Sequence, residues 1–239
     1  GSVLRGGAFK PRTSPYAFHG MAEDGLRILR AASDETGLPV ITEALDMKSL
    51  ELVYKYGDII QIGTRNMQNF SLLREAGKLD KPVMIKRGMS ATIDEWLLAA
   101  EYVLAGGNHQ VMLCERGIRS FDARYTRNVI DLGAIPVVKA LSHLPVVVDP
   151  SHGSGRRENV APMALASLAV GAHSILVDVH DEACKALCDG PQAMPPEEFA
   201  ELVKSCEKIS AALGIELDQA GRKPVSKHSH SKCKHCCFH

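Results

Sequence analysis

The sequence is built from short, uninterrupted apolar runs that alternate with longer amphipathic stretches. Continuous runs of this kind are typical of parallel strands whose two faces are both covered. The stretches between them, such as residues 21–36 and 92–105, place apolar residues at helical spacing. Strand and helix therefore alternate, which predicts an α/β fold with a parallel sheet. The seven expected strands begin at Val3, Val40, Ile59, Val83, Val111, Val146 and Ile175.

Polar residues after these strands distinguish two architectures. An open, doubly wound sheet uses only the strand ends beside its switch point, whereas a β/α barrel gathers all carboxyl ends at one mouth. The polar positions predict a TIM-type (β/α)8 barrel over residues 1–217. Seven strands are one fewer than eight, so we expect the first β/α unit to be absent from this chain. The residues at or just beyond strand ends are Lys10, Glu43, Arg65, Lys86, Arg116, His152 and Asp178.

Three later segments have specific expectations. Residues 128–141 are expected to be mixed, with an extended piece near Ile135 and Pro136 and a helix after it. Residues 174–180 are expected to form the last strand. The final helix is expected from residue 195 to about residue 213, because prolines and acids stand at its start.

Composition limits the classes of function. The 239 residues are 45% hydrophobic and carry a formal net charge of +0, so neither nucleic acid nor an acidic membrane surface is expected as a partner. No apolar run approaches the roughly 20 residues of a membrane-spanning helix. The 7 cysteines are odd in number and irregularly spaced, which indicates reduced thiols and a cytoplasmic protein.

The loop RGGAFKPRTSPY at residues 5–16 has the chemistry of a phosphate-binding segment. It combines cations with glycines, prolines and hydroxyl donors, although a solvated basic turn has the same composition. Cations also follow later strands, and together they suit two phosphorylated or carboxylated substrates bound side by side. Acidic residues, or the ligands themselves, must offset this charge. The cations are Arg5, Lys10, Arg12, Arg65, Lys86 and Arg116, and the acids are Glu43, Glu115 and Asp149.

A second set, His152, Asp178 and Asp189, has the donor types of a divalent metal site. One imidazole and two carboxylates leave positions open for water or substrate. The alternative is that His152 is a hydrogen-bonded histidine at a strand end. The spacing alone leaves both interpretations open.

Several motifs together resemble the 3-deoxy-7-phosphoheptulonate (DAHP) synthases, in the smaller form related to Kdo 8-phosphate synthases. The motifs are RGGAFKPRTSPY, DIIQIGTRNMQN, KRGMSATIDEW, CERGIRSFD, VVVDPSHGSGRR and CDGPQ, and the match covers residues 3–217. The resemblance implies a metal-dependent transferase of the shikimate route to aromatic amino acids, which condenses phosphoenolpyruvate with erythrose 4-phosphate. It also implies a homo-oligomer, a tetramer or a dimer, and a divalent ion drawn from Mn, Fe, Co and Zn, with Mn favoured.

The resemblance assigns roles residue by residue. Phosphoenolpyruvate is expected at Arg5, Lys10, Arg65, Lys86 and Arg116, with Gln61 and Glu115 nearby; erythrose 4-phosphate is expected at Lys10, Pro11, Arg12, Thr13 and Ser14; the metal is expected at His152, Asp178 and Asp189; and proton transfer is expected from Lys10 and His152.

Two departures from the family pattern leave alternatives open. The family's first strand ends in a cysteine metal ligand within a Gly-Pro-Cys motif, which is absent here, and Asp178 stands where the family has a glutamate. Both predict weaker metal binding. The alternatives are an inactive or partner-completed barrel that binds phosphorylated ligands, and an activity like that of Kdo 8-phosphate synthase.

Residues 218–239 do not continue the α/β pattern and are expected to form a disordered tail. Their histidines and cysteines could bind zinc or copper, or the tail could have no function. The candidate ligands are His228, His230, Cys233, His235, Cys236, Cys237 and His239.

Overall fold

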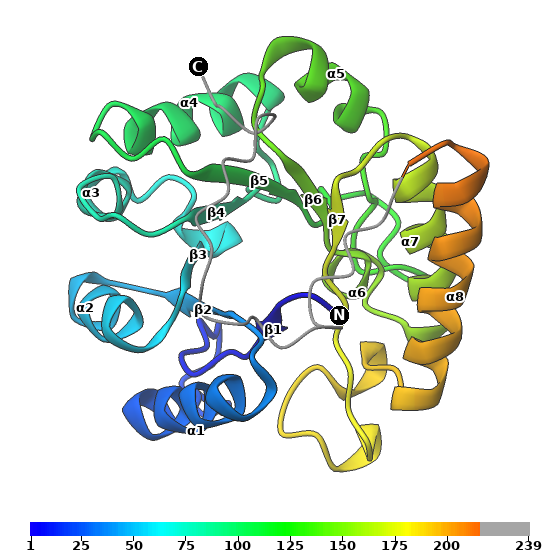
Figure 1. Cartoon of the computed structure of the whole chain (residues 1–239), viewed down its shortest axis with the longest axis horizontal. Coiled ribbons are helices and arrows are strands. Elements are labelled where there is room, and N and C mark those ends of the chain that lie inside the picture. Colours follow the sequence, from blue (N-terminus) through cyan, green and yellow to red (C-terminus); the bar gives the residue numbers. More distant parts are fainter. Residues whose placement is uncertain (216–239) are drawn as a thin grey trace, which may run out of the picture.

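The computed structural model describes residues 1–215, so the expected tail lies outside the described residues. Seven parallel strands form one sheet in the order β1-β2-β3-β4-β5-β6-β7. The sheet curls around an axis with the helices on its outside (Figure 1). Because the order is strictly sequential, the sheet has no switch point, and the barrel prediction is confirmed over the doubly wound alternative. The strands are β1 (Leu4–Arg5), β2 (Val40–Ala44), β3 (Ile59–Ile62), β4 (Val83–Lys86), β5 (Val111–Glu115), β6 (Val146–Val148) and β7 (Ser174–Ile175).

Helices follow the strands as the sequence predicted. Their starts are set by local capping: Asp46 and Ser49 form a capping box before α2, and Thr92 and Glu95 form another before α4. Gly37 ends α1 in the left-handed conformation that glycine adopts without strain. The helices are α1 (Ala22–Thr36), α2 (Met47–Tyr56), α3 (Phe70–Ala76), α4 (Ile93–Leu104), α5 (Ala134–Leu141), α6 (Pro150–Ser154), α7 (Arg157–Ala169) and α8 (Pro196–Ala212), with 3-10 turns η1 (Thr64–Asn66), η2 (Ala183–Lys185) and η3 (Gly190–Gln192).

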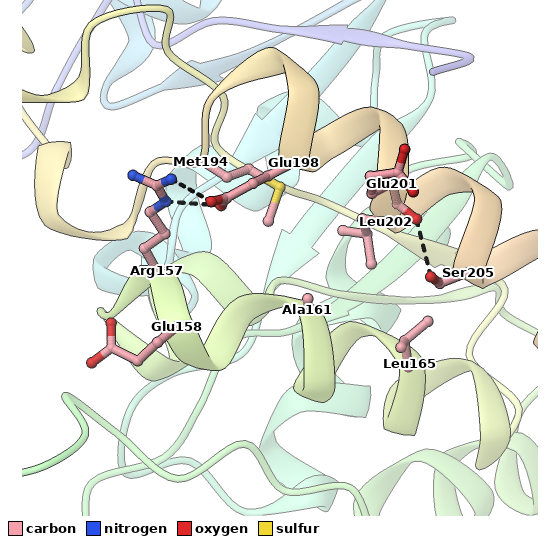
Figure 2. A pocket seen from close by; sticks show the side chains of 9 residues that line it. All are labelled: Arg157, Glu158, Ala161, Leu165, Met194, Glu198, Glu201, Leu202 and Ser205. Carbon is pink, nitrogen blue, oxygen red and sulfur yellow. Dashed lines mark hydrogen bonds and ion pairs between the residues drawn. The ribbon is translucent and has the colours of Figure 1, made fainter.

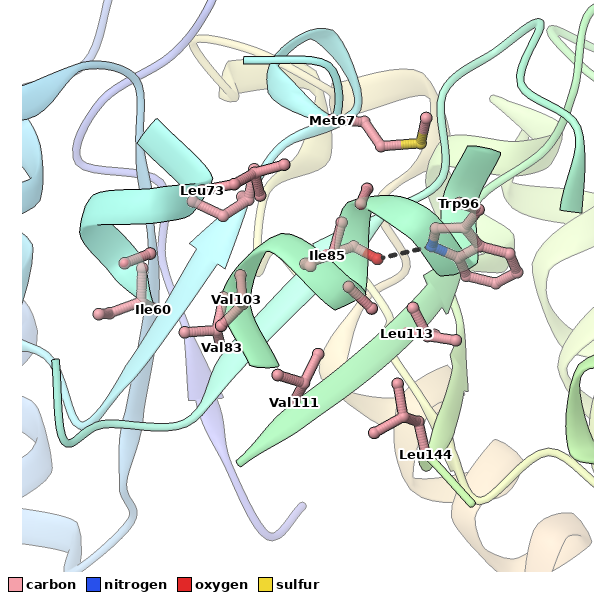
Figure 3. Close-up of a cluster of buried hydrophobic side chains, with 14 of the residues drawn as sticks. Ile60, Met67, Leu73, Val83, Ile85, Trp96, Val103, Val111, Leu113 and Leu144 are labelled. Carbon is pink, nitrogen blue, oxygen red and sulfur yellow. Dashed lines mark hydrogen bonds between the residues drawn. The ribbon is translucent and has the colours of Figure 1, made fainter. Parts of the chain in front are cut away.

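The main core lies between the sheet and the helices. Trp96 of α4 is fully buried there, and its indole nitrogen donates a hydrogen bond to the carbonyl oxygen of Ile85 at 3.1 Å (Figure 3). A second apolar cluster lies inside the barrel, nearer the amino ends of the strands than the polar residues that follow them. Successive residues of each strand point to opposite faces, so the same strands supply both clusters. The interior cluster consists of Ile41, Met84, Cys114, Val147 and Leu176.

Two local expectations were wrong. Ile135 and Pro136 lie inside α5 rather than in an extended piece, and the extended contact is instead the bridge between Ile118 and Val129. Proline is tolerated there because it stands in the first turn, where amide hydrogens have no helical partner. The last strand ends at Ile175, far short of residue 180.

A groove of about 430 Å³ lies between α7 and α8 on the outside of the barrel (Figure 2). Arg157 of α7 and Glu198 of α8 cross it as an ion pair, with 2.8 Å between Nε and Oε2. Its lining residues include none of the expected site residues. Within residues 1–215, no helix is long and apolar enough to cross a membrane.

Candidate functional site

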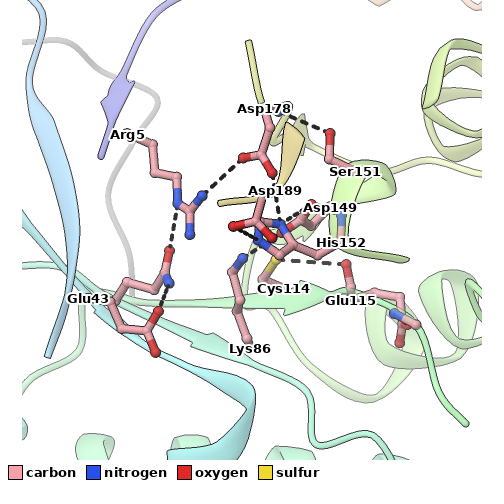
Figure 4. A network of polar contacts seen from close by, with 12 residues as sticks. Arg5, Glu43, Lys86, Cys114, Glu115, Asp149, Ser151, His152, Asp178 and Asp189 are labelled. Carbon is pink, nitrogen blue, oxygen red and sulfur yellow. Dashed lines mark hydrogen bonds and ion pairs between the residues drawn. The ribbon is translucent and has the colours of Figure 1, made fainter. Parts of the chain in front are cut away.

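The carboxyl ends of the strands bring the expected polar side chains together inside the barrel mouth (Figure 4). Arg5, in edge strand β1, links the two edges of the sheet, because its Nη1 contacts Oδ1 of Asp178, just beyond edge strand β7, at 3.0 Å. Its Nε also contacts Oε1 of Gln61 in β3 at 3.4 Å. Gln61 in turn donates to Glu43 Oε2 at 2.9 Å. Burial opposes the charge of Arg5, but the carboxylates of Asp178 and Asp149 outweigh burial and raise its pKa.

Asp149, directly after β6, is the central acid of the mouth. It is 0% exposed, and its Oδ2 accepts a hydrogen bond from the ammonium of Lys86. Its Oδ1 accepts from His152 Nδ1 at 3.1 Å and from the backbone amide of His152 at 2.9 Å, and the second bond caps the start of α6. Burial alone would raise the pKa of Asp149, but His152 and Lys86 hold it well below its ordinary value.

His152, Asp178 and Asp189 meet as the sequence suggested, with one ligand atom from each within 4.8 Å of the others. His152 lies in α6, one turn beyond the end of β6. Asp189 has a positive φ of 58° just before η3, and Lys10 Nζ lies 3.5 Å from its Oδ2. Burial opposes its ionisation, yet His152, Lys10 and Arg12 lower its pKa.

The donor set of this trio fits a divalent metal. Carboxylate oxygens with one imidazole are ligands that Mn²⁺, Fe²⁺, Co²⁺ and Zn²⁺ accept. Asp149 accepts from His152 Nδ1, and this contact leaves Nε2, 4.0 Å from Asp189 Oδ2, as the nitrogen able to coordinate.

A second region of the mouth is cationic, and the described residues form no ion pair with its arginines. Arg116 is 8% exposed, and its Nη1 is buried with no hydrogen-bond partner among the described residues. Burial, together with the nearby charges of Arg127 and Arg65, outweighs the attraction of Asp149 and lowers the pKa of Arg116. Arg12 Nη2 is likewise buried without a partner within residues 1–215. Buried guanidinium donors left free at one mouth are suited to bind an anion.

Some residues that were expected to contact substrate do not present an unpaired polar group inside this mouth. Glu115 is 0% exposed, and its carboxylate is held by Arg87 Nη1 at 2.9 Å and by the amide of Gly117 at 2.6 Å, so it has turned away from the barrel axis. Thr13 and Ser14 are exposed on the loop after Arg12, and Pro11 is half-buried. Their contacts with substrate stay predictions.

Sequence reasoning missed two residues of the site. Gln192 is fully buried and donates to Asp178 Oδ2 at 2.7 Å, so it helps to orient a candidate metal ligand. It is the last residue of the CDGPQ motif, which was its only signal. Arg127 lies in the loop between β5 and α5, away from any strand end, so the strand-end pattern did not predict it. Its side chain lies against Gly155.

The sequence matches the DAHP synthetase I family over residues 2–213. It is 54% identical over 216 residues to a phospho-2-dehydro-3-deoxyheptonate aldolase of Thermotoga maritima. That alignment covers 90% of this chain but only 64% of the relative, so the chain spans less than two thirds of the relative's length. A 2-dehydro-3-deoxyphosphooctonate aldolase of Syntrophobacter fumaroxidans is 30% identical over 205 residues, which cover 81% of this chain and 70% of that protein.

Solved structures agree with these sequence matches. The crystal structure of the Thermotoga maritima phospho-2-dehydro-3-deoxyheptonate aldolase (DAHP synthase) superposes with a TM-score of 0.87 at 52% identity, covering 91% of this chain and 63% of that one. A truncated form of the 3-deoxy-D-arabino-heptulosonate 7-phosphate synthase from the same organism gives a TM-score of 0.84 at 50% identity and covers 91% and 79%. By its sequence, its sheet order and its fold, this chain belongs to the DAHP synthetase I family.

Proposed function

We propose that this chain condenses phosphoenolpyruvate with erythrose 4-phosphate to form DAHP and phosphate, the first step of the shikimate pathway. The observation that carries the proposal is the shared mouth: Arg5 and Lys86 end two strands beside the trio that contains His152 (Figure 4), and Arg116 directly follows a third strand. The names of the Thermotoga maritima relatives support the same reaction.

The unpaired cations are assigned to phosphoenolpyruvate. Arg116 and Arg65 hold its phosphate, because Arg116 has a buried donor with no hydrogen-bond partner within residues 1–215. Lys86 lies between this region and Asp149, and its ammonium can shift toward the ligand's phosphate or carboxylate. As C3 of phosphoenolpyruvate attacks the aldehyde carbon, water adds at C2, and the C2–O bond to phosphate then breaks. Fixed cations stabilise the charge that moves onto the departing phosphate.

Erythrose 4-phosphate is assigned to the loop that carries Lys10 and Arg12. Arg12 Nε is fixed by the carbonyl oxygen of Phe18 at 3.0 Å, which leaves its buried Nη2 as the free donor. Lys10, 3.5 Å from Asp189, lies where it can protonate the aldehyde oxygen as that oxygen gains charge. His152 is the second proposed group for proton transfer.

A divalent ion, proposed as Mn²⁺, would bind His152, Asp178 and Asp189 and supply Lewis-acid polarisation of the aldehyde. Arg5 and Gln192 hold opposite oxygens of Asp178, so this carboxylate is oriented before an ion arrives. We further propose a homo-oligomer in the cytoplasm.

The test is release of inorganic phosphate from the full chain. Release should require phosphoenolpyruvate, erythrose 4-phosphate and Mn²⁺ together, and Lys86→Met should reduce kcat/KM at least about 100-fold. Lys81→Met is the matched control, because Lys81 lies outside the mouth, where it donates to the backbone carbonyls of Tyr54 and Gly57 and lies over the Tyr54 ring. Absence of turnover in folded, metal-loaded protein would refute the proposal. Faster turnover with a five-carbon aldose phosphate than with erythrose 4-phosphate would favour the reaction of the phosphooctonate relatives, because an eight-carbon product requires a five-carbon acceptor.

A further inference from the structure

Two charged residues lie immediately beside the anion-binding cations but point to the other face of the sheet. Arg87 follows Lys86, and Glu115 precedes Arg116. Neighbouring residues of a strand point to opposite faces, so the inward pair, Lys86 and Arg116, is backed by an outward pair. The two strands are joined at this level, because the amide of Arg87 donates to the carbonyl oxygen of Cys114 at 2.9 Å.

Arg87 is a buried hub between elements. It is 4% exposed, its Nη1 bonds Glu115 Oε2 and Asp131 Oδ2 at 2.9 Å each, and its Nε donates to the carbonyl oxygen of Ala91 at 3.1 Å. Its guanidinium carbon lies 5.7 Å from the centre of the Trp96 ring. One planar side chain thus ties the end of β4 to the end of β5, to the loop before α5 and to α4.

Because Arg87 holds the Glu115 carboxylate, the backbone is fixed on both sides of Arg116. Its Oε2 is held by Arg87, and its Oε1 accepts from the amide of Gly117 at 2.6 Å. Gly117 has a φ of 93°, and a Cβ there would meet Asn128 Cβ at 2.7 Å, so this turn fits tightly. Arg116 therefore lies between Glu115, whose carboxylate is held by Arg87, and Gly117, whose amide is held by that same carboxylate.

This arrangement matters because Arg116 forms no ion pair among the described residues. Its Nη1 has no hydrogen-bond partner there, and Arg65 and Arg127 repel its charge although Asp149 attracts it, so an unrestrained strand end would let it move toward solvent. We propose that Arg87 is a positioning residue, which acts through Glu115 to hold Arg116 and Lys86 at the separation that grips phosphoenolpyruvate. Arg87 itself touches no substrate. The inference rests on the proposed function and adds a determinant of substrate affinity outside the mouth.

The proposal predicts a selective loss of phosphoenolpyruvate binding. Arg87→Lys keeps the charge but cannot reach Glu115, Asp131 and the Ala91 carbonyl at once, so the Kd for phosphoenolpyruvate should rise about tenfold while the KM for erythrose 4-phosphate stays unchanged. The double variant Arg87→Met with Glu115→Gln removes both charges and so avoids a lone buried ion; it should show the same loss.

The control is Arg30→Lys, which alters an arginine that also bridges two acids, Asp34 and Asp58, at the opposite end of the barrel. Calorimetric titration of the full chain with phosphoenolpyruvate, together with urea unfolding, separates the outcomes. Equal losses of stability in Arg87→Lys and Arg30→Lys, with phosphoenolpyruvate affinity unchanged in both, would overturn this inference alone. No binding of phosphoenolpyruvate by the unaltered chain would overturn it together with the proposed function.

Discussion

Replacing Asp149 with asparagine would test how the mouth is held together. Asparagine has almost the same shape, and its oxygen can still accept from the amide of His152 and cap α6, so the local backbone should persist. What changes is charge. Lys86 loses its carboxylate, and His152 loses the charged acceptor of its Nδ1 hydrogen.

The size of both effects follows from burial. The side chains of Lys86 and Asp149 are 5% and 0% exposed, so an unpaired ammonium there should cost about 3 kcal/mol of unfolding free energy. For His152, loss of the acceptor 2.9 Å from Nδ1 removes the contact that fixes the ring and its tautomer. Loss of such a partner lowers metal affinity by about 10- to 100-fold.

Two measurements on Asp149→Asn separate these effects. Urea unfolding of the metal-free chain gives the stability change, and Mn²⁺ titration followed by electron paramagnetic resonance gives the metal affinity. Asp58→Asn is the control, because Asp58 also forms an ion pair, with Arg30 at 3.0 Å, but this pair is partly exposed and Asp58 lies just before β3, at the end of the sheet away from the mouth. It should lower stability without changing Mn²⁺ affinity. If Asp149→Asn binds Mn²⁺ as tightly as the unaltered chain, the assigned role of Asp149 is wrong.

Three further changes test the fold. Gly106→Ala should cost about 1–3 kcal/mol of unfolding free energy, because its Cβ would lie 2.8 Å from the backbone of Gly77; urea denaturation at unchanged secondary structure would check this, and a neutral result would contradict it. Burial lowers the pKa of His173, whose Nδ1 accepts from the amide of Val146 at 3.0 Å, so its contribution is complete above the unfolded-state pKa and is lost as pH falls through the folded-state value. Because the ring is largely accessible, unfolding at pH 7.5 and 5 should differ by only about 0.5 kcal/mol more in the unaltered chain than in His173→Phe, and equal pH dependence would refute this. Trp96→Phe should cost about 2 kcal/mol, measured by circular dichroism during denaturation, since it removes a buried hydrogen bond and part of a fully buried ring; an unchanged midpoint would argue against that hydrogen bond.

The sequence predicted the barrel because strand ends carry a repeated signal. Lys86 and His152 follow apolar runs that face both the barrel interior and the helices, and sequential β/α units place such ends at one mouth. The expected metal trio also meets, because Asp178 and Asp189 flank a loop that turns back beside α6. These predictions needed only the order of elements.

The face of the sheet to which a strand-end side chain points could not be predicted in the same way. Glu115 and Arg116 are neighbours at one strand end, yet one points outward to Arg87 and the other inward. A shift of one residue reverses the faces, and an apolar run buried on both sides gives no alternation to fix the register. Loop-delivered groups such as Arg127 and Gln192 depend on tertiary contacts that no local pattern records.

The mouth combines two regions with different charge balance, and this difference determines which ligand each region attracts. Around Asp149, each cation has an acid: Lys86 shares Asp149, and Arg5 pairs with Asp178. Around Arg116, Arg65 and Arg127 repel its charge while Asp149 attracts it, and the frame behind the strands holds the backbone in place. A metal ion is attracted by the first region and repelled by the second, whereas a phosphate is attracted by the second. We therefore propose that the two ligands bind in separate parts of one opening, with the aldehyde of the proposed reaction between them.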